Sequence, residues 1–164
     1  KVALSMLDGG RIGIASQALG VARACVESSV AYAHQLRELG GAPDGWSDVI
    51  DHKIAEMTAK LEAARLLTHK AAWLRDQKQP CGKEASLAKL FAAQTANACA
   101  NEALQIMGLE AYTAAYPVER YFRDARITEI FEGTSEIQKL VISRAVLSEY
   151  AKALEATAAV VGAA

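Results

Sequence analysis

The chain has 164 residues, of which 52% are hydrophobic and 6% aromatic, and its formal net charge is −1. This length suits one domain with a sizeable core, and alanine and aliphatic side chains must fill that core because aromatic rings are scarce. A nearly balanced charge excludes a large single-sign field that would attract nucleic acid or an anionic membrane. No apolar run approaches the roughly 20 residues of a membrane-spanning helix.

The three cysteines, Cys25, Cys81 and Cys99, are odd in number and widely spaced. This spacing argues against a disulfide framework and against a Cys-x-x-Cys metal site, and it favours a reducing compartment. The sequence starts without Met and without a signal-peptide pattern, so we interpret it as a segment of a longer chain.

From Arg11 to about Leu39, apolar side chains recur every three or four residues, which predicts a long amphipathic helix. Its expected buried face consists of Ile12, Ala15, Leu19, Ala22, Val26, Val30 and Ala33. The glycines and the proline of residues 40–45 are expected to end this helix.

A second helix is predicted from Ser47, acting as N-cap, to about Gln77. Its expected buried stripe consists of Ile50, Ile54, Met57, Leu61, Ala64 and Ala71. A third helix, Lys83 to Met107, is rich in alanine around its whole circumference, which predicts burial on several sides. Gly108 is placed to end it in a left-handed conformation.

The stretch from 109 to 133 is less regular, with a short helix expected over 117–126 because proline suits a first-turn position. Ser135-Glu136-Ile137-Gln138 matches a capping box and predicts a last helix through about Tyr150. We expect the alanine-rich tail, 151–164, to fray.

Four long helices joined by short turns, without strand-like alternation, predict an all-α fold, an up-and-down four-helix bundle. We expect a single domain over residues 1–164. Such bundles often hold di-iron sites, but none of His34, His52 and His69 has a glutamate three residues before it. Ordinary polar-face histidines, with no metal, are therefore the favoured interpretation.

Three arginines, Arg120, Arg123 and Arg126, are spaced three residues apart and could bind a phosphate group. Glu119 and Asp124 are interleaved with them. A network of ion pairs is therefore an equal alternative to an anion site.

The segment from Ile127 to Ser135 combines features suited to proton transfer. Glu132 follows Ile130 and Phe131, and burial against these side chains would disfavour its charged form and suit it to act as a base. Gly133 would let a ligand approach the backbone closely, and the helix N-terminus that follows suits an anion. On these residues alone, an ordinary surface-loop glutamate is still the favoured alternative.

Four segments, taken together and in order, resemble the C-terminal domain of the acyl-CoA dehydrogenase family. They are Leu7–Ala15, Glu62–Leu67, Tyr116–Ile127 and Ile130–Gln138. The resemblance covers about residues 4 to 150. It implies an FAD-dependent enzyme that forms a double bond between Cα and Cβ of an acyl-CoA thioester and passes electrons to an electron-transfer flavoprotein.

The resemblance also implies a homo-oligomer, a dimer or tetramer, in the bacterial cytoplasm or the mitochondrial matrix, and no activity for this segment by itself. Glu132 corresponds to the catalytic base, and its N–H to the amide that polarises the thioester carbonyl. The implied substrate contacts are Asp8, Arg11 and Gly133. The implied FAD contacts are Thr134, Ser135, Glu136, Gln105, Gly108 and Arg37, with Gln105 and Gly108 reaching the FAD of a neighbouring subunit. Some relatives carry the base just before the arginine of the first segment, where this chain has Gly10.

Two segments depart from the family pattern. Arg37 stands one place away from the family's FAD-binding arginine, and Leu109 and Ala111 stand where relatives have glycine. These departures motivate an alternative, a non-catalytic or structural subunit of a heteromeric dehydrogenase complex. A further alternative is an acyl-CoA oxidase that uses the same base with oxygen as the acceptor.

Overall fold

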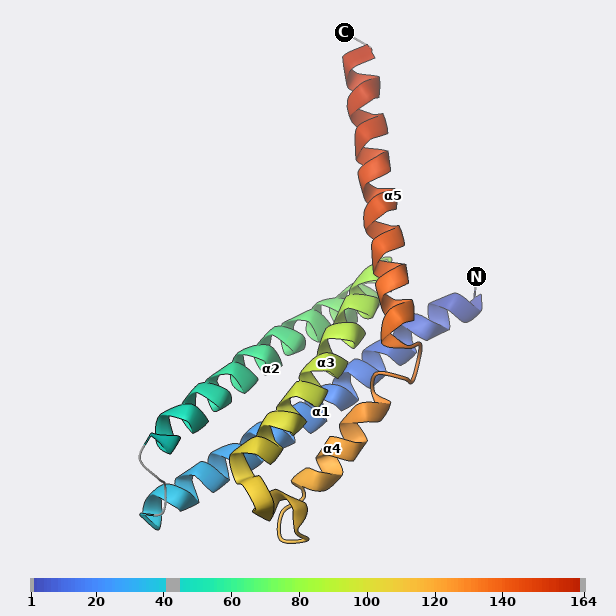
Figure 1. Ribbon diagram of the computed structural model, residues 1–164. Helices are drawn as coiled ribbons and strands as arrows, with labels where there is room; N and C mark the ends of the chain where they lie inside the picture. Colours follow the sequence, from blue (N-terminus) through green and yellow to red (C-terminus); the bar gives the residue numbers. More distant parts are fainter. Residues whose placement is uncertain (1, 41–44, 163–164) are drawn as a thin grey trace.

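The computed structural model describes the backbone of residues 2–40 and 45–162 and the side chains of residues 7–40 and 45–158. All regular elements in this part of the chain are helical (Figure 1). They are α1 (Val2–Glu38), α2 (Trp46–Asp76), α3 (Gly82–Met107), the 3₁₀ helix η1 (Gly108–Tyr112), α4 (Val118–Ile127) and α5 (Ser135–Gly162). The predicted all-α class is confirmed. Most of the expected turn at 40–45 lies outside the described residues.

Helix α3 is the central element, because α1, α2, α4 and α5 all pack against it (Figure 1). Its small side chains allow this close approach from several directions. The fully buried alanines of α3 are Ala85, Ala88, Ala92, Ala93, Ala96, Ala100 and Ala103. The prediction of a helix buried on several sides is therefore confirmed. Gly108 ends α3 with the expected positive φ of 60°, but its ψ of −134° is not that of the predicted left-handed conformation.

The buried face of α1 is rotated slightly from the predicted one. Ala15, Ala22 and Ala33 are buried as expected, but Val30 is 47% exposed and its prediction is wrong. The smaller Cys25 and Ser29 are fully buried in its place. The reason is steric, since small side chains on this face let α1 approach the alanine-rich α3. The predicted stripe of α2 is confirmed, with Thr68 added to it and Ile54 partly buried against the core.

Two helix starts differ from the predictions. Helix α1 begins well before Arg11, so Gly9 and Gly10 lie inside it, although glycine within a helix costs about 1 kcal/mol relative to alanine. Helix α2 begins at Trp46, and Ser47 does not cap it. The Ser47 hydroxyl instead accepts a hydrogen bond from Arg37 Nη2 at 3.2 Å.

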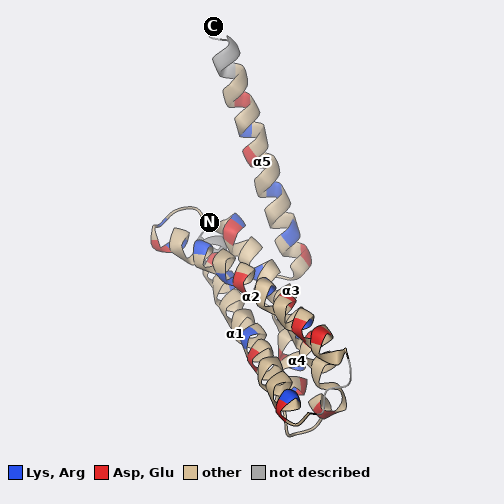
Figure 2. Cartoon of the chain, turned by 90° about the vertical axis from the view of Figure 1, so that its left-hand side faces the viewer, with Lys and Arg blue, Asp and Glu red and all other residues tan. Residues whose placement is uncertain are grey.

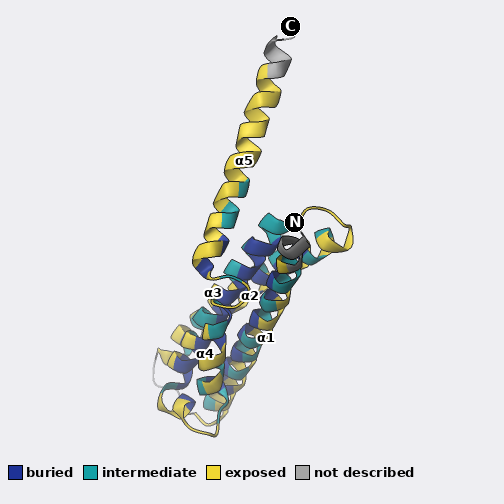
Figure 3. Cartoon of the chain, turned by 90° about the vertical axis from the view of Figure 1, so that its right-hand side faces the viewer, coloured by how far each residue is buried: buried dark blue, intermediate teal, exposed yellow. Residues whose placement is uncertain are grey.

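The short helix α4 lies along α1 and α3, and α5 begins against α3 and then projects away from the other helices (Figures 1 and 3). The fourth helix of the bundle, packed beside α1 and α3, is therefore α4, and not the last helix of the chain. The large apolar side chains that remain exposed in the described part of α5 are Ile137, Leu140, Val146, Leu147, Tyr150 and Leu154.

Acidic and basic residues are interspersed along the helices (Figure 2). Many are joined in pairs within one helix, such as Arg23 with Glu27 at 2.7 Å. Within residues 2–40 and 45–162, none of the helices has the length and apolar character needed to cross a membrane.

Candidate active site

The connection between α4 and α5 contains two consecutive residues with left-handed backbone. Glu132 has φ 54° and Gly133 has φ 100°. The conformation is easy for glycine but costs about 1–3 kcal/mol for a residue with a side chain. Backbone strain of this kind persists where surrounding contacts hold it, and it is concentrated at functional sites.

The carboxyl group of Glu132 lies directly on the backbone of Gly10 in α1. A Cβ atom on Gly10 would lie 2.8 Å from Glu132 Oε1 and closer still to Oε2 and Cδ. Only glycine at this position leaves room for the carboxyl group, which explains why α1 tolerates a glycine here. Gly9 is similar, since its Cβ would collide with the guanidinium of Arg75.

The Gly9–Gly10 pair opens onto a cavity of about 540 Å³ between α1 and α2. Its lining consists of Gly9, Gly10, Ile12, Gly13, Ala72, Arg75 and Asp76. Gly10, on which the Glu132 carboxyl group lies, is thus one of the residues that line a space able to admit part of a ligand.

One turn of α1 brings Asp8 and Arg11 to the same place. Arg11 Nη1 donates a hydrogen bond to Asp8 Oδ1 at 3.1 Å, and the arginine is only 7% exposed. Its Nε is buried without a partner in the described part of the chain. A buried donor without a partner carries a desolvation cost, so this arginine is suited to receive an acceptor from a ligand or another domain.

Two fully buried polar side chains bind the carbonyl oxygens of the left-handed turn. Lys89 Nζ of α3 donates to the Gly133 carbonyl at 2.8 Å. Gln138 Nε2 of α5 donates to the carbonyls of Glu132 and Gly133, both at 3.1 Å. Burial lowers the pKa of Lys89, an effect that Glu129 opposes and Arg11 reinforces.

Sequence reasoning missed these roles for Lys89 and Gln138. A signal for Lys89 was present, since it follows Ala85 by four residues and precedes Ala92 by three, which places a lysine on the alanine face of α3. The capping-box interpretation of Gln138 is wrong. Thr134 caps α5 instead, with Thr134 Oγ1 accepting from the Ile137 N–H at 3.4 Å.

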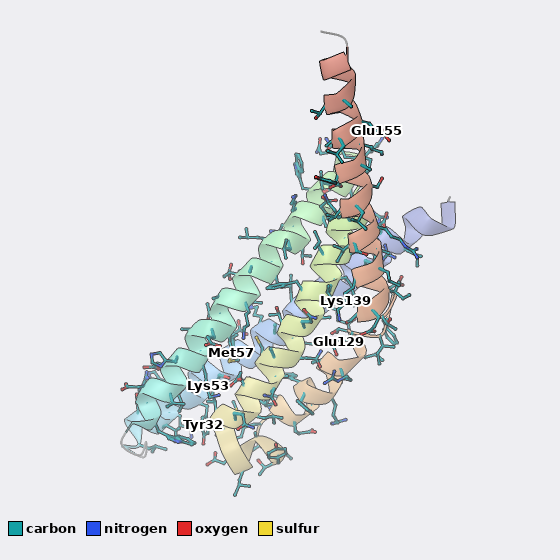
Figure 4. The ribbon with its side chains drawn as sticks, turned by 45° about the horizontal axis from the view of Figure 1, so that its top comes forward. Tyr32, Lys53, Met57, Glu129, Lys139 and Glu155 are labelled. Atoms are coloured by element: carbon teal, nitrogen blue, oxygen red, sulfur yellow. The ribbon has the colours of Figure 1, made fainter. Side chains whose placement is uncertain are left out.

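The start of α5 borders a second cavity of about 330 Å³. Thr134, Ser135 and Glu136 line it together with Glu129 and Lys139, which Figure 4 labels at the junction of α4 and α5. Ser135 Oγ is buried without a partner among the described residues. The pKa of Glu136 is lowered, first by its own backbone N–H and then by the Thr134 hydroxyl.

One expectation for the glutamate is wrong for this chain. Ile130 and Phe131 are 52% and 51% exposed, so they do not bury the Glu132 carboxyl group. Both side chains are therefore open to solvent in this part of the chain. Desolvation of this glutamate therefore requires a covering group from outside the described residues.

The remaining predicted site residues lie elsewhere. Arg37 pairs with Asp51 near the far end of α1, roughly 39 Å along the helix from Arg11. Gln105 and Gly108 lie at the C-terminal end of α3. The structure thus brings together Asp8, Arg11, Glu132, Gly133, Thr134, Ser135 and Glu136, but it does not bring Arg37, Gln105 or Gly108 to them.

The arginine cluster of α4 favours the ion-pair interpretation. Arg123 Nη2 lies 3.0 Å from Glu119 Oε2, and Arg126 pairs with Glu129. Arg120 lies over the ring of Tyr121, 5.6 Å from its centroid. In the described part of the chain, no group of three metal-ligating side chains is assembled.

Comparison with known proteins places this geometry in a family. The model of the family "Acyl-CoA dehydrogenase, C-terminal domain" matches residues 1–147. The human mitochondrial short-chain specific acyl-CoA dehydrogenase is 52% identical over 150 residues, which are 92% of this chain and 36% of the relative. The chain therefore spans little more than a third of the length of the curated relatives it matches.

Comparison with solved structures gives the same family. Butyryl-CoA dehydrogenase from Megasphaera elsdenii superposes with a TM-score of 0.83 at 41% identity, covering 90% of this chain and 38% of the other. A chain of the structure described as the electron transferring flavoprotein of Acidaminococcus fermentans gives a TM-score of 0.83 at 40% identity, covering 90% and 38%. The chain belongs to the acyl-CoA dehydrogenase family, in which it corresponds to the C-terminal helical domain.

Proposed function

We propose that this chain is the helical part of an FAD-dependent enzyme that desaturates an acyl-CoA thioester, with Glu132 as the base. The observation that carries the proposal is the placement of the Glu132 carboxyl group on Gly10, which precedes Arg11 of the Asp8–Arg11 pair and is one of the residues lining the cavity between α1 and α2. The names of the relatives favour a short acyl chain.

The proposed reaction removes two hydrogens from the substrate. The bond between Cα and its hydrogen breaks, and the proton passes to the Glu132 carboxylate as the Cα=Cβ double bond forms. The second hydrogen leaves Cβ with its electron pair. A proton beside a thioester is only weakly acidic, so the rate depends on where the base is held more than on its intrinsic strength.

Backbone geometry at Glu132 supports a second role. In the described part of the chain, no group accepts a hydrogen bond from the Glu132 N–H. This N–H is therefore able to donate to the thioester carbonyl of the substrate. Such a donor stabilises the negative charge that develops on the carbonyl oxygen when the α-proton leaves.

FAD, when bound, supplies the acceptor for the hydrogen and electron pair that leave Cβ. Ser135 fits a contact with it, because its buried hydroxyl has no partner among the described residues, and Thr134 and Glu136 line the same cavity. Gln105, Gly108 and Arg37 lie too far away to share this site within one copy. We propose that they contact FAD held by a second copy in a dimer or tetramer, with an electron-transfer flavoprotein as the redox partner.

The test uses the full-length enzyme with bound FAD. The Glu132→Gln variant is expected to keep its flavin but to lose the bleaching of flavin absorbance when a short-chain acyl-CoA is added. The amide is close to the carboxylate in size but cannot take the proton. Bleaching at the wild-type rate would remove Glu132 from the role of base.

A second candidate function is a non-catalytic subunit of a heteromeric complex. The observation in its favour is Leu109, which is 89% exposed on η1 at a position where the family motif has glycine. Purification of the full-length chain alone distinguishes the two. A yellow protein that is bleached by acyl-CoA favours the enzyme, whereas a colourless protein that gains flavin only with a partner favours the subunit.

A further inference from the structure

The carbonyl oxygens of Glu132 and Gly133 are bound from two directions by side chains with no exposed surface. Lys89 approaches from the first half of α3, and Gln138 from the first turn of α5. Three hydrogen bonds therefore converge on one two-residue turn.

Lys89 is an unusual choice for this position. In the described part of the chain, no carboxylate lies within ion-pair distance of its Nζ, and the Gly133 carbonyl is its hydrogen-bond acceptor. An ammonium group taken out of water carries a large desolvation penalty, and an apolar side chain of the same size would fill the space at lower cost. The lysine is therefore better explained by what it binds than by the volume it fills.

Gln138 supports the same interpretation. Its Nε2 must face the turn, because the opposite orientation would set Oε1 against two carbonyl oxygens. Oε1 is left buried without a partner in the described structure. A Cβ on Gly133 would lie 2.7 Å from Nε2, so glycine is needed at 133 for this contact as well as for its positive φ.

We propose that Lys89 and Gln138 are positioning residues that hold the left-handed Glu132–Gly133 turn, and with it the carboxylate over Gly10. The inference rests on the proposed function of Glu132. Release of the turn would let Glu132 relax toward ordinary backbone angles, which would move both the carboxylate and the N–H proposed to bind the thioester carbonyl. Displacement of a reacting group by about 1 Å lowers rates by roughly 100-fold.

The experiment compares Lys89→Met and Gln138→Met in the full-length enzyme with bound FAD. Each change keeps most of the side-chain volume and removes the N–H donors. Lys83→Met is the matched control, since Lys83 also lies in α3 and contacts α5, through Glu149 at 2.7 Å, but does not contact the turn. Flavin reduction is followed in a single turnover at saturating short-chain acyl-CoA.

The amplitude and the rate of flavin reduction distinguish a positioning residue from a residue that only supports the fold. A residue that only supports the fold lowers the amplitude, which counts intact enzyme, and leaves the rate of the remaining molecules unchanged. For Lys89→Met and Gln138→Met we expect a rate roughly 10- to 100-fold lower. FAD content and affinity for a non-reducible acyl-CoA should stay near wild type, and Lys83→Met should reduce its flavin at the wild-type rate.

Rates within twofold of wild type in both variants would overturn the inference, and so would a loss of amplitude alone. If Lys89→Met does not fold, Gln138→Met decides the outcome, because it changes no charge. The Glu132→Gln enzyme is measured in parallel. If that enzyme reduces flavin normally, the proposed function itself fails, whereas an inactive Glu132→Gln beside two fast variants removes only the positioning roles.

Discussion

The middle of α3 and its N-terminal half pack against α1 with different kinds of side chain. In the middle, Ala96, Cys99 and Ala100 are fully buried in an apolar layer that includes Cys25. Toward the site, Lys89 and Arg11 are buried, together with Gln138 from α5.

The three buried side-chain atoms that lack a partner in the described structure are Arg11 Nε, Ser135 Oγ and Gln138 Oε1. All of them belong to the site. The middle of the bundle is thus closely packed and apolar, whereas the site end contains buried polar groups and left-handed backbone next to Glu132, as the proposed positioning of this residue requires.

The largest effect is expected from Gly10→Ala, measured as the rate of flavin reduction in the full-length enzyme. The added methyl group would take the space of the Glu132 carboxyl group and displace it, so we expect a rate about 100-fold lower. Stability should change little, because a flexible side-chain end moves aside. Gly20→Ala is the control, since a Cβ there meets nothing within 4 Å. Wild-type activity in Gly10→Ala would contradict the placement of the carboxyl group.

A substitution in the apolar middle of α3 should have the opposite effect, lowering stability without changing the rate of flavin reduction. Ala96 is fully buried, so Ala96→Leu is expected to lower the free energy of unfolding by about 1–3 kcal/mol through overpacking. The molecules that remain folded should keep the wild-type rate of flavin reduction. Urea denaturation measures the change, with Ala59→Leu on the exposed side of α2 as control. Equal stability of the two variants would refute the close packing of this layer.

Alkaline pH should weaken the same layer. Burial, and then the nearby Cys99, raise the pKa of Cys25 from 9.0 to about 12. In the unfolded chain this thiol loses its proton from about pH 9, whereas the folded protein retains it. The folded state thus binds more protons over this window, and stability falls as pH rises, by up to about 1.4 kcal/mol per pH unit. In Cys25→Ala, the free energy of unfolding should fall less steeply as pH rises. Identical slopes in the variant and the wild type would show that the Cys25 thiol does not cause the loss of stability.

The smallest predicted effect concerns Gly20, where an added side chain would meet no other atom in the described part of the chain. Gly20 lies inside α1, where alanine is favoured by about 0.5–1 kcal/mol and the added Cβ enters open space. Gly20→Ala should therefore raise the free energy of unfolding by that amount, as thermal or urea denaturation would show. A loss of stability would indicate that Gly20 contacts another domain or subunit.

Much of the helical framework could be predicted from local pattern. The stripe from Ile50 to Ala71 and the alanines of α3 repeat with helical spacing, and that spacing reports directly which side of a helix is buried. Glu132 was predicted as the base from the resemblance to the family, and the structure places its carboxyl group against Gly10, between Asp8 and Arg11 in the sequence of α1.

The contacts around the glutamate were not predictable in this way. Gly10 is explained only by a side chain that arrives from a distant part of the sequence, and Lys89 only by the carbonyl it meets. Helical spacing shows that a position is buried but not which atom lies opposite. The exposure of Phe131 was missed for a related reason, because an apolar residue in a turn can be covered by another domain or subunit.

The most direct measurement asks whether Glu132 removes a proton from Cα when the second half of the reaction is blocked. An acyl-CoA with sulfur in place of Cβ has no hydrogen to lose there, so the full-length enzyme in D₂O is expected to exchange only its α-hydrogens, as mass spectrometry would detect. The Glu132→Gln enzyme should bind the same compound and leave it unlabelled. Deuterium incorporation at the wild-type rate by that variant would contradict the role assigned to this carboxylate.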